Sequence, residues 1–172
     1  GMAIEIERKF LLRNSDWKQH SKTSARLREG LISATGQKIR IRIAGSSATL
    51  CVKLPRFGIS RYEFEYAIPL EDAELLISAC GDNTLEKTRH IANFQGDRWE
   101  IDEYHGALAG LVLAEIELCE EHQPFARPEW LGREVTEDPR YRKEYLLRSS
   151  QTITFPLDLR ESTHRPLIFE QS

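Results

Sequence analysis

Cysteine is scarce in this sequence, and its few cysteines are poorly placed for a structural role. Cys51, Cys80 and Cys119 are an odd number in 172 residues, lie far apart, and form no Cys-x-x-Cys or Cys/His ligand pattern. This spacing argues against a disulfide framework and against a structural zinc site. We therefore expect reduced thiols and a cytoplasmic location.

Long apolar runs and a one-sided charge are also missing. No segment approaches the roughly 20 apolar residues that a membrane-spanning helix requires, and the charged N-terminus does not resemble a signal peptide. The formal net charge is -3, from 24 basic and 27 acidic residues, which excludes a broad basic surface for nucleic acid. We expect neither a membrane nor a specific nucleic acid as partner, and the sequence leaves open whether the protein forms oligomers.

Familiar catalytic motifs are absent as well. The sequence has no evident Ser/His/Asp or Cys/His triad and no Gly-x-x-x-x-Gly-Lys-[Ser/Thr] loop for phosphate binding. Its five histidines lack the spacing of metal ligands. Any chemistry must therefore come mainly from carboxylates, lysines and arginines.

What the sequence has in abundance is strict alternation between apolar and charged residues, which is the period of a β-strand. Its length suits one domain, which we place at residues 1–150, followed by an irregular or partly ordered tail over 151–172. The predicted strands cover residues 4–12, 27–33, 38–43, 49–54, 61–66, 85–92, 98–104 and 112–119. Tight turns are predicted at 44–47 and 95–97. Start and stop signals predict helices over 69–80 and 138–149, and shorter helices over 15–22 and 128–131.

The charged faces of these strands carry the functional information. Glu5, Glu7 and Lys9 share one side of the first strand, because side chains alternate between faces. Like charges recur at this spacing in later strands, with acidic strands separate from basic ones: Lys38/Arg40/Arg42, Lys53, Arg61/Glu63/Glu65, Lys87/Arg89, Arg98/Glu100/Asp102 and Glu115/Glu117. Alternation alone favours a solvated outer face, but repulsion at this density requires partners.

Closing about eight such strands into a barrel gives the charges those partners. The apolar faces then point outward beneath helices, and the charged faces line a tunnel. Carboxylates can bind divalent cations there, while lysines and arginines bind phosphate oxygens. If the strands close in this way, the tunnel would hold a metal ion and a polyphosphate.

The order of the charged segments along the chain is itself distinctive. It begins with Glu5-Ile6-Glu7-Arg8-Lys9 and continues with Ile39-Arg40-Ile41-Arg42, Lys53, Ser60-Arg61-Tyr62-Glu63-Phe64-Glu65, Glu86-Lys87-Thr88-Arg89, Ile101-Asp102, Leu113-Ala114-Glu115-Ile116-Glu117 and Glu134-Val135-Thr136-Glu137-Asp138. The series resembles the CYTH domains, also called triphosphate tunnel metalloenzymes, over roughly residues 3–148. The first segment matches the Glu-x-Glu-x-Lys signature of that family.

This resemblance implies an α+β, mainly β fold, an eight-stranded antiparallel closed barrel with helices packed outside. Its tunnel is expected to bind triphosphate-containing small molecules with Mg²⁺ or Mn²⁺. By position, the implied metal ligands are Glu5, Glu7, Asp102, Glu115 and Glu117, with Glu63 and Glu65 as further ligands or orienting groups. The implied triphosphate contacts are Lys9, Arg40, Arg42, Lys53, Arg61, Lys87 and Arg89. Within this set we assign catalytic roles to Lys87, Glu7 and Glu117.

The activity implied by the resemblance is metal-dependent hydrolysis of a triphosphate. Inorganic tripolyphosphate is the leading substrate, with water attacking the terminal phosphorus. Two alternatives stay open: a class IV adenylate cyclase, which converts ATP into cyclic AMP and pyrophosphate, and a non-catalytic module that binds polyphosphate or nucleotide.

Some positions do not follow the family pattern. Many small relatives read roughly Gln-Gly-Tyr-Leu where this chain has Glu29-Gly30-Leu31-Ile32. Leu31 cannot donate a hydrogen bond, which argues against a mechanism that relies on a tyrosine–lysine pair. Arg98 and Glu100 match no motif and fit a surface pair as well as a tunnel position. For Lys143, on the last predicted helix, a position outside the tunnel is favoured.

Overall fold

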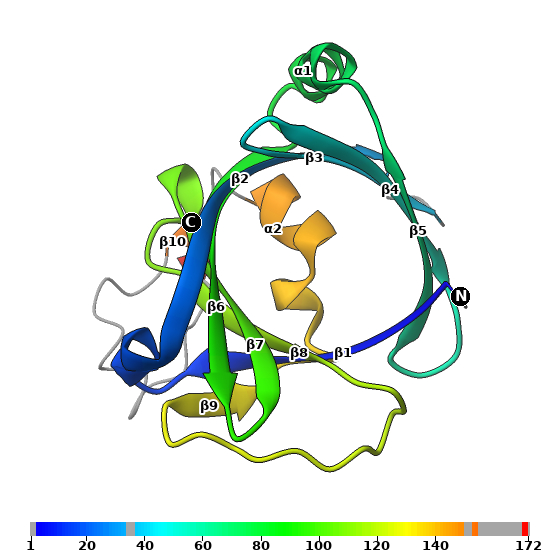
Figure 1. The fold of residues 1–172 in the computed structure, drawn as a ribbon. Helices are drawn as coiled ribbons and strands as arrows, with labels where there is room; N and C mark the ends of the chain where they lie inside the picture. Colours follow the sequence, from blue (N-terminus) through cyan, green and yellow to red (C-terminus); the bar gives the residue numbers. More distant parts are fainter. Residues whose placement is uncertain (1–2, 34–36, 150–152, 155–169, 172) are drawn as a thin grey trace.

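Eight strands close into an antiparallel barrel in the computed structural model, which describes residues 3–33, 37–149, 153–154 and 170–171 (Figure 1). Around the barrel the order is β5, β4, β3, β2, β6, β7, β8 and β1, and β1 pairs with β5 to close it. These strands are β1 (Ile4–Leu12), β2 (Ser21–Ser33), β3 (Lys38–Ala44), β4 (Ser47–Pro55), β5 (Ser60–Ala67), β6 (Thr84–Phe94), β7 (Asp97–Tyr104) and β8 (Val112–Glu117). The predicted fold class is confirmed.

Short turns join several neighbouring strands, as the sequence predicted. Between β6 and β7, Gln95 and Gly96 have φ angles of 47° and 86°, both in the left-handed region. A two-residue turn of this kind matches the twist of antiparallel strands. The β3–β4 turn likewise contains Gly45 at φ 61°.

Both predicted short helices are corrected by the structure. The predicted helix over 15–22 is only the 3₁₀ turn η1 (Asp16–His20), and the second strand begins at Ser21 rather than 27 because β2 pairs with β6 from that residue onward. The predicted helix over 128–131 is absent. The chain instead turns there and forms β9 (Leu131–Glu134), an extra strand that pairs with the end of β1.

The apolar faces of the strands point outward, where different elements cover them. Helix α1 (Leu70–Ala79), predicted from its end signals, packs over β2, β3 and β4. Its Ala73 and Ile77 join Ile41 and Ile43 in one outer cluster. A second outer cluster is covered mainly by η1 and the segment before β9, and includes Phe10, Leu12, Trp17, Trp99 and Trp130.

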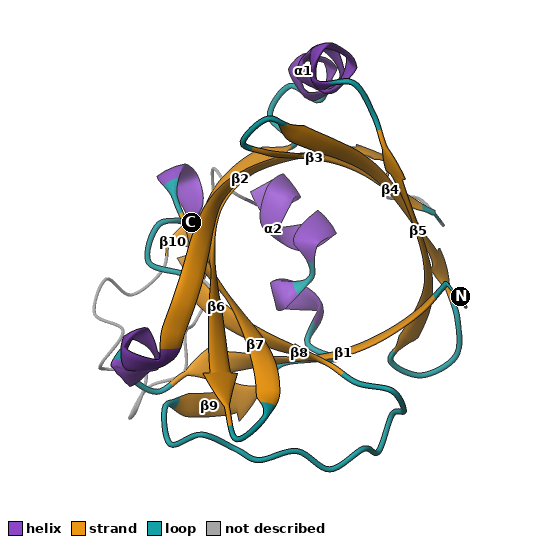
Figure 2. Ribbon diagram, in the orientation of Figure 1, coloured by secondary structure: helices purple, strands orange, loops and turns teal. Residues whose placement is uncertain are grey.

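Residues 138–149, here called the C-terminal segment, lie inside the ring of strands and not outside it (Figure 2). The predicted helix over 138–149 is divided into the 3₁₀ turn η3 (Pro139–Tyr141) and α2 (Lys143–Ser149), because Arg142 between them is extended. Asp138 caps the first turn as expected, since its carboxylate accepts the backbone N–H of Arg140 at 3.0 Å.

Apolar residues explain this inward position. A third cluster combines inward-facing strand residues with residues of the C-terminal segment and of the 3₁₀ turn η2 (Gly106–Leu108): Leu11, Leu31, Leu85, Tyr104, Leu108, Leu111, Leu113, Val135, Tyr141, Leu146 and Leu147. The expectation that all helices pack outside therefore fails for α2. Burying this apolar surface fills part of the barrel interior, and the charged positions surround what is left.

Most of the predicted tail, residues 151–172, lies outside the described residues, and the domain boundary at residue 150 stays a prediction. Two short strands of it are described, β10 (Ile153–Thr154) and β11 (Glu170–Gln171), which pair with each other. In the described part of the chain, neither length nor hydropathy would let any helix cross a membrane.

Candidate active site

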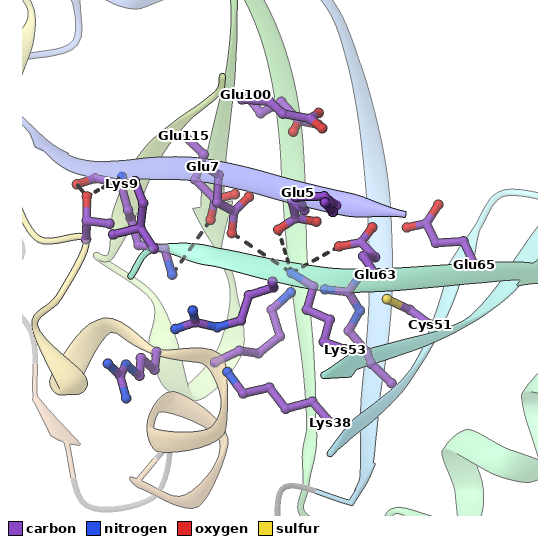
Figure 3. Close-up of a pocket in the computed structure, with 18 of the residues that line it drawn as sticks. Glu5, Glu7, Lys9, Lys38, Cys51, Lys53, Glu63, Glu65, Glu100 and Glu115 are labelled. Atoms are coloured by element: carbon purple, nitrogen blue, oxygen red, sulfur yellow. Dashed lines mark hydrogen bonds and ion pairs between the residues drawn. The ribbon is translucent and has the colours of Figure 1, made fainter. Parts of the chain in front are cut away.

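A cavity of about 640 Å³ lies within the barrel, and side chains from all eight barrel strands and from the C-terminal segment line it (Figure 3). Every predicted site residue lines this cavity except Lys87 and Asp102. Those that line it are Glu5, Glu7, Lys9, Arg40, Arg42, Lys53, Arg61, Glu63, Glu65, Arg89, Glu115 and Glu117. The barrel therefore brings together residues that are spread over more than a hundred positions of the chain.

The acidic side of the cavity is built by β1, β7 and β8. Glu7 lies directly opposite Glu117, and Glu115 lies opposite both Lys9 and Glu100 in the strand register. Burial and the negative charges of Glu100 and Glu7 raise the pKa of Glu117 above its ordinary value. Carboxylates that repel one another in this way favour a bound cation, and their oxygens are the ligands that Mg²⁺ and Mn²⁺ prefer.

Two lysines already neutralise part of this acidic side. The Lys53 ammonium lies 2.9 Å from Glu5, 3.3 Å from Glu63 and 4.0 Å from Glu7. Burial alone would lower the pKa of Lys53, but Glu7 and Glu5 hold it above the ordinary value, so the lysine is charged. Lys9 lies 3.8 Å from Glu115 and donates a hydrogen bond to the carbonyl of Tyr141 at 3.0 Å.

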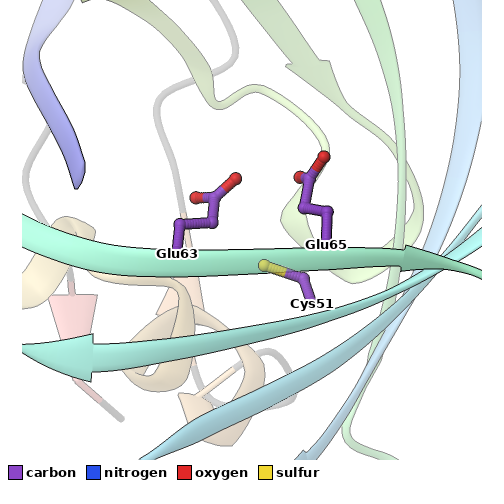
Figure 4. A group of neighbouring side chains, drawn as sticks. All are labelled: Cys51, Glu63 and Glu65. Carbon is purple, nitrogen blue, oxygen red and sulfur yellow. The ribbon is translucent and has the colours of Figure 1, made fainter. Parts of the chain in front are cut away.

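A separate group of metal-ligand types lies on β4 and β5. One ligand atom each of Cys51, Glu63 and Glu65 lies within 4.8 Å of the other two (Figure 4), and Cys51 is opposite Glu65 in the strand register. The thiol is a softer ligand than a carboxylate. If Glu63 and Glu65 bind a metal, as the resemblance implies, Cys51 is near enough to influence which metal they select.

The basic side of the cavity is formed by arginines with only part of each side chain exposed. The exposed fraction is 10% for Arg40, 19% for Arg42 and 15% for Arg89. Arg61 also lines the cavity, and its guanidinium donates to the carbonyls of Gly58 and Ser60. Guanidinium groups held in this way present fixed N–H donors, which suits the recognition of phosphate oxygens.

Lys87 and Asp102 lie behind this basic side rather than at the cavity, each with 1% of its side chain exposed. The Lys87 ammonium is 2.8 Å from Asp102, and Arg89 makes two hydrogen bonds to the same carboxylate, at 2.8 and 2.9 Å. Burial would raise the pKa of Asp102, but Lys87 and Arg89 hold it below its ordinary value. Both Asp102 oxygens are engaged by Lys87 and Arg89, so in this arrangement the carboxylate orients these cations and does not line the cavity where the other predicted metal ligands lie.

Sequence reasoning missed the most buried acid of the site, Glu29 on β2. Its side chain is completely buried and lies among basic groups on three elements. A signal was present in the sequence, because Glu29 interrupts the alternating apolar row that contains Leu27 and Leu31. Leu31 itself packs in the inner apolar cluster, as its lack of a polar group leads one to expect.

Other cavity residues were left open or wrongly placed by the sequence. Glu100 belongs to the cavity and lies 2.9 Å from Arg89, so the pairing of Arg98 with Glu100 is not a purely surface feature. Lys143 also lines the cavity, which corrects the favoured position outside the tunnel. It does so because the C-terminal segment is folded into the barrel.

The fold and the site together define a class of protein. Proteins of this class are closed β-barrels in which one side of the interior is lined by carboxylates and the other by lysines and arginines. This arrangement is suited to binding a metal ion together with a polyanion.

The particular family follows from comparison with known proteins. The chain belongs to the CYTH domain family, whose model matches residues 3–149. It is 41% identical over 150 residues to an inorganic triphosphatase of Acetivibrio thermocellus, covering 86% of this chain and 96% of the relative. An inorganic triphosphatase of Nitrosomonas europaea is 35% identical over 150 residues, covering 84% and 97%.

A solved structure supports the same assignment. The crystal structure of an inorganic triphosphatase has a TM-score of 0.62 and 32% sequence identity to this chain, and the match covers 83% of this chain and 93% of that one.

Proposed function

We propose that this protein is a metal-dependent triphosphatase that hydrolyses inorganic tripolyphosphate by attack of water on the terminal phosphorus. The observation that carries the proposal is the division of one cavity into an acidic side and a basic side. Triphosphate oxygens can contact the basic side, and the carboxylates of the acidic side would hold a divalent metal ion. The two relatives named inorganic triphosphatases, which match over nearly their whole length, support it further.

A divalent metal requirement accompanies this family, and we propose that Glu5, Glu7, Glu115 and Glu117 hold the ion. The donor set fits, because these four side chains line one cavity and the Glu7–Glu117 pair is repulsive without a cation. Bound Mg²⁺ or Mn²⁺ neutralises phosphate charge and lowers the pKa of a coordinated water. Of the predicted catalytic residues, Glu7 and Glu117 take their roles at this position.

The basic residues bind and orient the phosphate groups. Phosphoryl transfer depends mainly on positioning and on positive charge around the transferred group. Arg40, Arg42 and Arg89 supply fixed donors, whereas Lys9 and Lys53 can exchange their carboxylate partners for phosphate oxygens. We assign Lys87 a positioning role, because it contacts Glu29 and Asp102 and does not line the cavity.

Product analysis tests this proposal directly. The protein is incubated with tripolyphosphate or ATP, each with Mg²⁺ and with Mn²⁺, and phosphate, pyrophosphate and cyclic AMP are measured. Metal-dependent release of phosphate from tripolyphosphate is expected. Formation of cyclic AMP and pyrophosphate from ATP would replace the proposal with the cyclase alternative. Tight metal-linked binding without phosphate release would instead indicate a non-catalytic binding module.

A further inference from the structure

Glu29 is a completely buried carboxylate located directly behind the basic side of the cavity. Four basic side chains surround it, and the nitrogen-to-oxygen distances are 2.9 Å for Lys87, 3.0 Å for Arg42, 3.2 Å for Lys143 and 3.3 Å for Arg40. Burial and the charge of Arg40 lower the pKa of Lys143 well below its ordinary value, so the charge argument rests on the other three. Three of the four side chains line the cavity, whereas Glu29 does not. The carboxylate is thus separated from the cavity by its own partners.

The four basic side chains depend on this one acid. Within the described residues, Glu29 is the sole ion-pair partner of Arg40, Arg42 and Lys143. Lys87 pairs with both Glu29 and Asp102. So many positive groups at such distances repel one another strongly in a poorly solvated interior. Burial would raise the pKa of Glu29, but its cationic neighbours hold it well below the ordinary value, so the group is ionised.

We propose that Glu29 is a built-in counter-anion that positions the basic side of the cavity and sets its affinity for phosphate groups. The inference rests on the proposed function in one respect, that phosphate oxygens bind at this basic side. Glu29 contacts no substrate, so it is a positioning residue. Its contacts involve Nε of Arg40 and Nε and Nη2 of Arg42, and within the described residues these two cavity-lining guanidinium groups have no other ion pair.

The negative charge of Glu29 is also expected to affect the affinity for the product more than the affinity for the substrate. A triphosphate gains affinity from both the basic side and the metal at the acidic side. A short product such as pyrophosphate that contacts the basic side alone has only the net positive charge there to retain it. By cancelling one positive charge, Glu29 weakens this second kind of binding and favours product release.

The test uses Glu29→Gln, which removes the charge and keeps the side-chain size. The matched control is Glu86→Gln on β6, because Glu86 pairs with Arg26 at the surface, 2.7 Å away, and does not line the cavity. Pyrophosphate affinity is measured by thermal unfolding and calorimetry with a chelator present, so this part needs no turnover. Steady-state kinetics with tripolyphosphate and Mg²⁺ are measured separately.

Glu29→Gln is expected to bind pyrophosphate about tenfold more tightly than the wild type, because one opposing charge near the ligand is lost. KM for tripolyphosphate and kcat are both expected to fall, with stronger inhibition by pyrophosphate, and Glu86→Gln is expected to match the wild type. Unchanged or weaker pyrophosphate affinity in folded Glu29→Gln overturns the proposal. Absence of tripolyphosphate hydrolysis by the wild type would refute the proposed function and leave the binding result to be judged alone.

The variant remains informative if it is unstable. If Glu29→Gln unfolds without ligand, pyrophosphate is expected to restore the folded state, because phosphate oxygens replace the missing carboxylate; failure to restore it counts against the proposal. Glu29→Asp keeps the charge and is expected to bind pyrophosphate with nearly wild-type affinity. Equally tight binding by the Asp and Gln variants would mean that the charge is not the cause.

Discussion

Replacing Glu117 by glutamine should change the stability of the protein in opposite directions with and without metal. Glu117 on β8 lies directly opposite Glu7 on β1, and its pKa is raised by burial and by Glu100 and Glu7. The carboxylate is therefore unfavourable to the folded state until a cation binds. Glutamine removes the repulsion, but it also removes one of the proposed metal ligands.

Without metal, the expected gain in the free energy of unfolding of Glu117→Gln is small. Like charges directly opposite in a sheet cost about 0.2–1 kcal/mol. The Glu117 side chain is only partly buried and keeps much of its surface in solvent, so solvent screening places the gain near the middle of that range or below. A gain of about 0.5 kcal/mol corresponds to a rise in Tm of roughly 1–2 °C for a chain of this size. At 100 times the dissociation constant, metal binding stabilises the wild type by about 2.7 kcal/mol, and most of this is lost in the variant.

The assay is thermal unfolding of both proteins in chelator and in saturating Mg²⁺ or Mn²⁺, together with phosphate release. Glu117→Gln should be slightly more stable in chelator, less stable in metal, and inactive. Glu134→Gln is the control, because the change in stability expected without metal has the opposite sign. Glu134 pairs with Arg8 outside the barrel, so its loss should destabilise the protein equally with and without metal. A Glu117 variant that keeps metal-dependent turnover refutes the metal assignment.

Three further outcomes are expected. Arg42→Ala should raise KM for tripolyphosphate roughly 10- to 150-fold, since losing one charge-assisted hydrogen bond costs about 1.5–3 kcal/mol; unchanged kinetics would place Arg42 outside the phosphate path. Asp102→Asn should lower the free energy of unfolding by about 3–5 kcal/mol, measured with urea, because the buried charges of Lys87 and Arg89 lose their shared partner; an unaltered midpoint would contradict this. The depressed pKa of Glu29 means that the unfolded chain binds the proton more readily. Its contribution to stability is therefore complete above the ordinary pKa of 4.5 and is lost as pH falls through the depressed value. Urea unfolding between neutral and acidic pH should show this loss in the wild type and a flatter profile in Glu29→Gln.

Much of the site was predictable because alternation fixes which residues share a face of a strand. Glu5, Glu7 and Lys9 form one row whichever way the strand faces, and closure of the barrel turns that row inward. The outer apolar faces could be inferred in the same way. Apart from the longer second strand and the additional β9, the strand pattern needed little correction.

Tertiary packing decided the parts that have no short-range signal. The residues of 138–149 read as a helix, but whether that helix lies outside or inside the barrel depends on the apolar surface that Tyr141, Leu146 and Leu147 find there. Only this inward fold brings Lys143 to the cavity. Lys87 and Arg89 share one face of β6, so the sequence could not show that Arg89 lines the cavity while Lys87 lies buried behind it.

The sequence alone determined the strands, their charged faces and the residues available for metal and phosphate, because the two-residue period of a strand is a local property. The structure decided which charges meet across the barrel. Glu29 illustrates the difference: its partners come from β3, β6 and α2, and burial among them depends on contacts between residues as far apart as Glu29 and Lys143. In the sequence Glu29 is one of many acids, but in the folded chain it is the common partner of four basic side chains.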